Sequence, residues 1–279
     1  MSTWDEFECQ LKDIRHNHTS RFFPLLFRGH SDSCWALDTT LDRSKHEGMK
    51  FDDYYRIISS FHPEVETLTG NTWSIPAYQD IVALVQDYDR LSLELSFGRN
   101  PAYDYLAYLR HHGFPSPLLD WTRSPYIAAY FAFSKAKHST KRVSIYVLSE
   151  ADLHTGSSGI PIIYRFGGRV RVHRRHVLQQ SEYTMCLVFN ANKEWRFAKH
   201  DEAMGSGEII DGTKWNLHFS KINVPSKEKD KVLKLLDEHN LNAFSLFGSE
   251  ESLMETRLPI STLQQLAVSS IFFVHSIGL

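Results

Sequence analysis

The sequence predicts an α+β or α/β core, and three segments carry that prediction. Residues 143–148 alternate along the chain and are rich in β-branched side chains, which is typical of a strand. Residues 118–122 form a short apolar step that ends in polar side chains. Ser124 and Pro125 then begin an apolar helix, because serine caps helices well and proline fits the first turn. A strand that ends in polar residues before a helix often carries ligand-binding groups.

Length and composition are those of an ordinary globular protein. The chain has 279 residues, of which 42% are hydrophobic and 23% are charged. Its net charge of -2 gives no global surplus for bulk binding of nucleic acid or membrane, although a local basic patch stays open. The three cysteines, Cys9, Cys34 and Cys186, are scattered and lack CxxC spacing. We therefore expect neither a disulfide framework nor a thiolate zinc site, and a reducing compartment.

The sequence also predicts a cytoplasmic protein with no membrane contact. The first residues lack the basic-then-apolar order of a signal peptide. No apolar run approaches the roughly 18 residues that a membrane-spanning helix needs.

Taken in order, the chain divides into a helix, a main domain and a tail. We expect an N-terminal helix over residues 1–24, a main domain over 25–256 and an apolar tail over 257–279. The apolar stripe of the first helix is formed by Trp4, Phe7, Leu11 and Ile14. Residues 25–29 predict a buried strand in which Arg28 sits where the strand leaves the core. This arginine suits ligand binding and the pairing of a core carboxylate about equally.

Most of residues 45–100 are predicted to be helical and to cover one face of a sheet. The first helical stripe consists of Phe51, Tyr54, Tyr55, Ile58 and Phe61. A second helix is expected over residues 81–93, with an interruption near Asp87. The segment carries no pattern that indicates chemistry.

The second half contains an arginine-rich segment and a strand with a polar row. Residues 164–176 hold five arginines and two histidines, which suit either a solvated surface or contact with phosphate. Residues 177–189 predict a strand in which Gln180, Glu182 and Thr184 share one face. That row suits either a site wall or an ordinary solvent-exposed face.

The common catalytic and cofactor motifs are absent from the sequence. It contains no Walker A loop, no Rossmann glycine triplet, no HExxH and no GxSxG. The adjacent His111 and His112 point about 100° apart on a helix and cannot chelate one metal ion, so we expect no metal. Chemistry would therefore rest on three polar clusters: Arg28, the residues from His111 to Thr122, and the strand from Gln180 to Glu182.

In this order, the clusters resemble the FRG domain family, which is named for a Phe-Arg-Gly that stands here at residues 27–29. The most distinctive family block, Leu-x-His-x-Gly-x-Pro-(Thr/Ser)-x-Leu-Leu-Asp-Trp-Thr and the helix after it, is similar to residues 109–132. The family's Arg…Gln-Gln-Gly-x-Phe-Thr step resembles residues 175–184. The resemblance extends over roughly residues 25–256.

A weaker resemblance connects the chain to the arginine-serine-glutamate ADP-ribosyltransferases. That layout implies an α+β fold with split mixed or antiparallel sheets and flanking helices, and NAD as a substrate. It implies catalytic roles for Arg28, Asp120, Thr122 and Glu182, with Glu182 stabilising the charge that builds as nicotinamide leaves. The residues expected to contact NAD are Arg28, His111, His112, Trp121, Thr122 and Gln180.

Three functions remain open from the sequence. The first is an NAD-consuming ADP-ribosyltransferase that modifies an unidentified protein, nucleic-acid or nucleotide acceptor. The second is a non-catalytic module that binds a nucleotide or nucleic acid through Trp121 and the arginine-rich segment. The third is acid–base chemistry at His111, His112 and Asp120. Related domains suggest, by analogy alone, a bacterial toxin or an antiviral, phage-defence protein with a neutralising or regulatory partner.

Overall fold

The computed structural model describes residues 2–18, 24–149, 159–167, 174–203, 208–210, 213–215 and 219–257. The strands are β1 (Leu26–His30), β2 (Leu119–Thr122), β3 (Arg142–Leu148), β4 (Ile162–Phe166), β5 (Ser181–Phe189), β6 (Trp195–Phe197), β7 (Glu208–Ile210), β8 (Thr213–Trp215) and β9 (Phe219–Pro225). The helices are α1 (Trp4–Asn17), α2 (Thr40–Arg43), α3 (Phe51–Ser60), α4 (His62–Thr69), α5 (Tyr78–Gln86), α6 (Tyr88–Ser96), α7 (Tyr103–His111), α8 (Pro125–Ser134), α9 (Arg174–Leu178), α10 (His200–Ala203), η1 (Ser226–Glu228), α11 (Lys229–Glu238), α12 (Ala243–Phe247) and α13 (Glu250–Arg257).

The strands form one open sheet in the order β4-β5-β2-β1-β3-β9-β8-β7, with β6 added beside β5. Every pair of neighbouring strands in the described part of the chain is antiparallel. The sheet is nearly divided between β1 and β2, which pair at the single register position of Phe27 and Thr122. The α+β class is thereby confirmed, because a doubly wound α/β core would need parallel strands.

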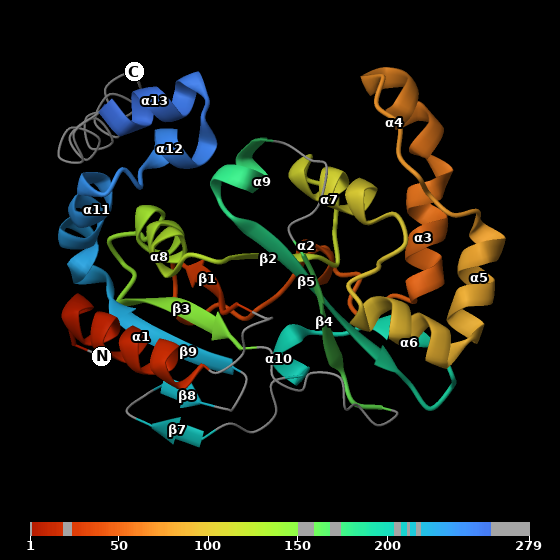
Figure 1. Ribbon diagram of the computed structural model, residues 1–279, viewed down its shortest axis with the longest axis horizontal. Helices are drawn as coiled ribbons and strands as arrows, with labels where there is room; N and C mark the ends of the chain where they lie inside the picture. Colours follow the sequence, from red (N-terminus) through yellow and green to blue (C-terminus); the bar gives the residue numbers. More distant parts are fainter. Residues whose placement is uncertain are drawn as a thin grey trace, which may run out of the picture.

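Helices cover the two halves of the sheet separately. Figure 1 shows α3, α4, α5 and α6 gathered on one side of the molecule, and α1, α8 and α11 on the other. One core cluster packs α3, α6 and α7 against β4, β5 and β6. A second cluster packs α1, α8 and α11 against β1, β3 and β9. A third, smaller cluster, which includes Leu26, Trp121 and Tyr146, joins β1, β2 and β3. The described residues thus form three apolar clusters, and the smallest connects β1 and β2 where their backbone pairing is weak.

The predicted helices are confirmed where sequence periodicity is strong. Helix α1 buries Trp4, Phe7 and Leu11 of the expected stripe, and Thr3 caps it by accepting a hydrogen bond from the Glu6 amide. Helix α3 buries four of the five expected residues, Phe51, Tyr54, Tyr55 and Ile58. The expected interruption at Asp87 is a helix boundary, where its side chain caps α6. No helix in the described ranges is long and apolar enough to cross a membrane.

Gly29 brings α8 unusually close to β1. A Cβ at this position would lie 1.9 Å from the Ala128 carbonyl oxygen, so no other residue fits without moving the helix backbone. The side chain of Ser124 caps α8 by accepting from the Ile127 amide, and Pro125 occupies the first turn as predicted. The Phe-Arg-Gly sequence therefore has a packing role: Phe27 enters the core beside α8, and Gly29 permits the approach.

The predicted strand over residues 177–189 begins later than expected. Residues 174–178 form α9, and β5 starts at Ser181. Gln180 lies in the turn between them with a left-handed φ of 48°, so it is not part of the predicted polar row. The central part of the arginine-rich segment, residues 168–173, and the predicted tail beyond Arg257 lie outside the described residues.

Candidate functional site

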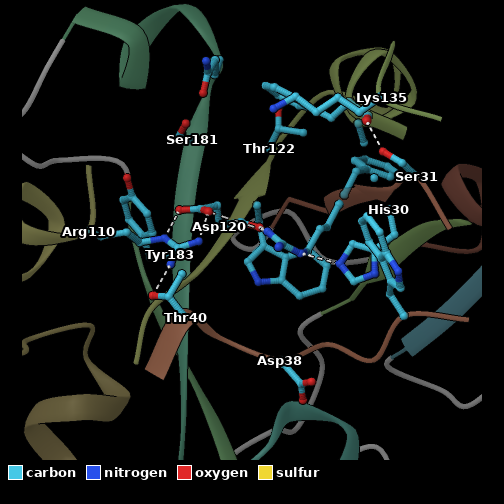
Figure 2. Close-up of a pocket in the computed structure, with 18 of the residues that line it drawn as sticks. His30, Ser31, Asp38, Thr40, Arg110, Asp120, Thr122, Lys135, Ser181 and Tyr183 are labelled. Carbon is cyan, nitrogen blue, oxygen red and sulfur yellow. Dashed lines mark hydrogen bonds and ion pairs between the residues drawn. The ribbon is translucent and has the colours of Figure 1, made fainter. Parts of the chain in front are cut away.

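A cavity of about 880 Å³ opens where β1 and β2 stop pairing. Residues 28–30 of β1 and residues 120–122 of β2 line it, together with Ser181 and Tyr183 of β5. Figure 2 shows Asp120, Tyr183 and Arg110 on one side of this space and His30 and Ser31 on the other. Because backbone pairing ends after one residue pair, the sheet itself leaves the gap in which these side chains meet.

The pairing of β2 with β5 determines which side chains share the cavity face. Asp120 lies opposite Tyr183, and Thr122 lies opposite Ser181. Opposed residues of antiparallel strands project to the same face, and residues two apart on one strand do so as well. These four polar side chains therefore form one patch, and all four line the cavity.

Arg110 at the end of α7 holds the Asp120 carboxylate in a two-pronged ion pair. Its Nε donates to Asp120 Oδ1 at 2.5 Å, its Nη2 donates to Oδ2, and its Nη1 donates to Thr40 Oγ1 at 3.2 Å. Burial alone would raise the pKa of Asp120, but Arg110 outweighs it and, with Arg28, lowers that pKa to about 2. The Asp120 side chain is nevertheless 42% exposed, because it faces the open cavity. The result is a fixed, ionised carboxylate that a ligand can reach.

Arg28 reaches the same carboxylate from β1. Its Nη1 donates to the Asp120 carbonyl oxygen at 2.7 Å and lies 3.7 Å from Asp120 Oδ2. Its Nε donates to His30 Nε2 at 3.1 Å. Burial is the main cause that lowers the pKa of Arg28, to about 10, so the guanidinium is protonated at neutral pH. Among the described residues no group accepts a hydrogen bond from its Nη2, which leaves that nitrogen for a ligand.

His30 accepts this hydrogen bond as a neutral ring. It is 6% exposed, and burial, followed by the charge of Arg28, lowers its pKa to about 3. A neutral histidine can accept from Arg28 Nε, whereas an imidazolium would repel it. His30 therefore fixes the orientation of the guanidinium across the cavity.

The two adjacent histidines have different positions. His111 lines the cavity, and its Nε2 lies 3.0 Å from the Tyr183 hydroxyl. His112 caps the end of α7 and is not among the lining residues. Its ring packs against that of Tyr108, with ring centroids 4.3 Å apart. Of the two histidines predicted to contact NAD, the structure brings only His111 to the cavity.

Glu182 occupies the other face of β5 from Ser181 and Tyr183. Its Oε2 accepts from Arg165 Nε at 2.7 Å and from Nη2 at 2.6 Å, and its Oε1 lies 3.0 Å from Arg123 Nε. Its side chain is 5% exposed and does not line the cavity. The structure therefore brings Arg28, Asp120 and Thr122 together but places Glu182 in a separate two-arginine clamp.

Trp121 and Gln180 contribute less to the cavity than the sequence suggested. Trp121 is 2% exposed, and its indole nitrogen donates to Thr184 Oγ1 at 2.7 Å. Thr184 in turn lies 2.8 Å from Nε2 of the buried His200. The ring is thus a core element that stiffens β2 against β5, although the residue borders the cavity. Gln180 lies in its turn and is not among the lining residues.

Residues 24–141 match the FRG domain family. This part of the chain is similar to an FRG domain. No match to a curated protein or to a solved structure is found. Within the matched range lie β1, α7, β2 and α8, which carry Arg28, Arg110 and Asp120. The β5 wall of the cavity, with Ser181 and Tyr183, lies outside it.

Several residues that line the cavity were not predicted as site residues. Arg110 lies outside the three polar clusters that the sequence predicts, and Tyr183 is predicted only as a member of a strand. Two signals in the sequence were available for them. Arg110 is a cation ten residues before Asp120, and the period of a strand places Tyr183 on the opposite face of β5 from Glu182. The other unpredicted polar or aromatic lining residues, besides Phe27 of the Phe-Arg-Gly sequence, are His30, Ser31, Cys34, Trp35, Asp38, Thr40, Arg43, Phe131, Lys135, Gln179 and Ser181.

The donor set of the described residues does not suggest a metal centre. Among them, no group of three histidine, cysteine, aspartate or glutamate side chains is placed to hold an ion. The lining instead carries four permanent cations, Arg28, Arg43, Arg110 and Lys135, against two carboxylates, Asp38 and Asp120. That excess favours an anionic ligand, and arginine is well suited to phosphate.

Proposed function

We propose that the protein binds NAD in this cavity and transfers its ADP-ribose to an acceptor. One observation carries the proposal: Arg28 offers an unpaired guanidinium nitrogen beside the reachable carboxylate of Asp120. The guanidinium suits a pyrophosphate or ribose oxygen, and the carboxylate suits a developing positive charge. Thr122 and Ser181 add hydroxyl groups on the same face for ribose contacts.

The chemical step needs only a positioned carboxylate and an acceptor. The bond between nicotinamide nitrogen and ribose C1′ breaks, and its electron pair leaves with neutral nicotinamide. Positive charge builds on the ribose as this happens, and a preorganised carboxylate lowers the barrier electrostatically. The acceptor donates a lone pair to C1′, and its proton passes to water. We assign the carboxylate role to Asp120, because Glu182 would first have to leave Arg123 and Arg165.

A second function uses the same cavity without chemistry. The clamped position of Glu182, the carboxylate that the ADP-ribosyltransferase resemblance implies for catalysis, favours a module that only binds a nucleotide. The excess of arginine and lysine in the lining would then supply most of the affinity.

Nicotinamide release separates the two functions. Purified protein would be incubated with NAD, with and without protein and nucleic-acid acceptors, and released nicotinamide quantified by chromatography. We expect release, a rise in Tm with NAD, and at least an approximately 100-fold loss of release in Arg28→Gln. Arg99→Gln is the matched control, because Arg99 is an exposed arginine outside the cavity. A rise in Tm without release under any acceptor would favour the binding module, and neither signal would reject both.

A further inference from the structure

The segment between β1 and α2 forms one wall of the cavity and carries an exposed tryptophan. Ser31, Cys34, Trp35, Ala36 and Asp38 of this segment line the cavity. Trp35 is 54% exposed, whereas Trp4, Trp121 and Trp195 are 2% exposed or less. An exposed indole that borders a cavity offers a flat apolar surface to a planar ligand.

The backbone around this tryptophan is fixed by hydrogen bonds to distant elements. The Trp35 carbonyl accepts from the Tyr146 hydroxyl at 3.1 Å, and the Leu37 amide donates to Asp201 Oδ2 at 3.0 Å. The Cys34 amide donates to Asp32 Oδ1 at 2.9 Å. The indole also lies edge-on to His30, with ring centroids 6.2 Å apart. The backbone that carries the indole is therefore fixed before a ligand arrives, which lowers the ordering cost of binding.

A cation from α2 lies in the same wall. Arg43 donates through Nη1 to the Asp38 carbonyl oxygen at 2.8 Å, and among the described residues no carboxylate forms an ion pair with it. No carboxylate therefore competes with a ligand for its guanidinium, and further N–H groups remain to donate. Lys135, at the end of α8, is a second exposed cation in the lining. An aromatic platform flanked by such cations is the arrangement that proteins use for single-stranded nucleic acid.

We propose that Trp35 and Arg43 form an acceptor subsite that takes a nucleobase with its attached phosphate. This inference rests on the proposed function and specifies its acceptor. The base stacks on the Trp35 indole and the phosphate pairs with Arg43, so that a nucleophilic atom of the nucleotide points toward Arg28 and Asp120. That atom supplies the electron pair for the new bond to ribose C1′, nicotinamide leaves with the pair of the old bond, and the displaced proton passes to water.

Binding of two labelled probes tests the subsite in the full chain. The probes are fluorescent AMP and a fluorescent single-stranded DNA oligonucleotide of mixed sequence, measured by anisotropy at low and at physiological salt. We expect Trp35→Ala to raise the Kd of the oligonucleotide about 10-fold or more, and Trp35→Phe to raise it less, because phenylalanine keeps a stacking face. Arg43→Gln should weaken binding and reduce its salt dependence.

The matched control is Phe97→Ala, which removes an aromatic ring that is 69% exposed but lies outside the cavity lining. This variant should leave the Kd of both probes unchanged. Tighter binding of the oligonucleotide than of AMP supports nucleic acid as the source of the nucleotide, and equal binding supports a free nucleotide. Wild-type affinity in folded Trp35→Ala, or modification of a protein acceptor alone, would overturn the subsite.

The same preparations distinguish a failure of the subsite from a failure of the proposed function. If wild-type protein releases nicotinamide from NAD but binds neither probe, the subsite is wrong and the proposed function stands. If it binds the probes through Trp35 but neither binds nor cleaves NAD, the ADP-ribosyltransferase proposal is wrong.

Discussion

Asp120 and Glu182 lie one register step apart on paired strands, yet their carboxylates have opposite surroundings. Asp120 is held by Arg110, approached by Arg28 and 42% exposed to the cavity. Glu182 is held between two arginines and is 5% exposed. Alternation along the strands separates them, because each step along a strand reverses the face. The comparison indicates that one carboxylate is available to a ligand while the other ties strands together.

The largest expected effect on stability comes from removing the clamped carboxylate. Glu182→Gln removes the carboxylate that pairs with Arg165, whose side chain is 8% exposed. We expect the free energy of unfolding to fall by about 3 kcal/mol, because breaking a buried ion pair by removing one partner is strongly destabilising. Urea denaturation measures this loss. Glu194→Gln is the control, since that ion-paired glutamate is more exposed, and it should cost clearly less than Glu182→Gln.

The open carboxylate should matter for activity as well as for stability. Asp120→Asn keeps the side-chain shape but removes the charge beside Arg28. We expect nicotinamide release to fall about 100-fold or more. Stability should fall too, because Arg110 is only 10% exposed and loses the carboxylate that it holds, but less than in Glu182→Gln, because water reaches the 42% exposed Asp120 side chain. Paired measurements of release and urea denaturation compare the two variants directly. Full activity in Asp120→Asn would show that Asp120 is not the catalytic carboxylate. Loss of activity without loss of stability in Glu182→Gln would assign that role to Glu182.

The cavity side also predicts a pH dependence of stability. The pKa of His30 is lowered to about 3 in the folded protein, so between about pH 6.5 and 3 the unfolded chain binds a proton that the folded chain does not. The stability that the neutral His30 ring contributes is fully present above pH 6.5. It is lost as the pH falls toward 3, by at most about 1.4 kcal/mol per pH unit. Urea midpoints between pH 4 and 7 should therefore depend less steeply on pH in His30→Asn. An unchanged slope would show that the ring titrates freely in the folded state.

The smallest effect should come from the exposed arm of the clamp. The Arg123 side chain is 50% exposed, whereas that of Arg165 is 8% exposed. Arg123→Gln should cost no more than about 1 kcal/mol, as solvent-exposed ion pairs do, and Arg165→Gln should cost clearly more. Equal losses in urea denaturation would mean that the two arginines share the charge of Glu182 evenly.

Local sequence signals predicted the elements with the strongest patterns. The stripe of α1, the stripe of α3 and the Ser124–Pro125 start of α8 depend on neighbouring residues, and all three are confirmed. The strand predicted over residues 143–148 is β3. The late start of β5 was missed, because the apolar pair at 177–178 resembles a strand when its helical turn is not recognised.

The arrangement of the site was harder to predict because it depends on tertiary contacts. The sequence placed Glu182 in a polar row, but both faces of β5 are buried, so alternation alone does not indicate which face meets the cavity. The pairing of Arg110 with Asp120 depends on how α7 approaches β2, which no local pattern encodes. Trp35 belongs to no periodic apolar pattern, so the sequence does not indicate whether its side chain is buried or exposed.

The near-division of the sheet has a practical consequence for recombinant fragments. The family match ends at residue 141, just before β3, and it excludes β5 as well. A fragment cut at these limits would keep β1 and β2, which pair at one residue position. It would lack β3, which pairs with the other edge of β1, and β5, which pairs with the other edge of β2. Unpaired strand edges of this kind template aggregation. The shortest fragment expected to fold must therefore retain β3, β5 and β9, and the recognisable family signature is smaller than the cooperative unit.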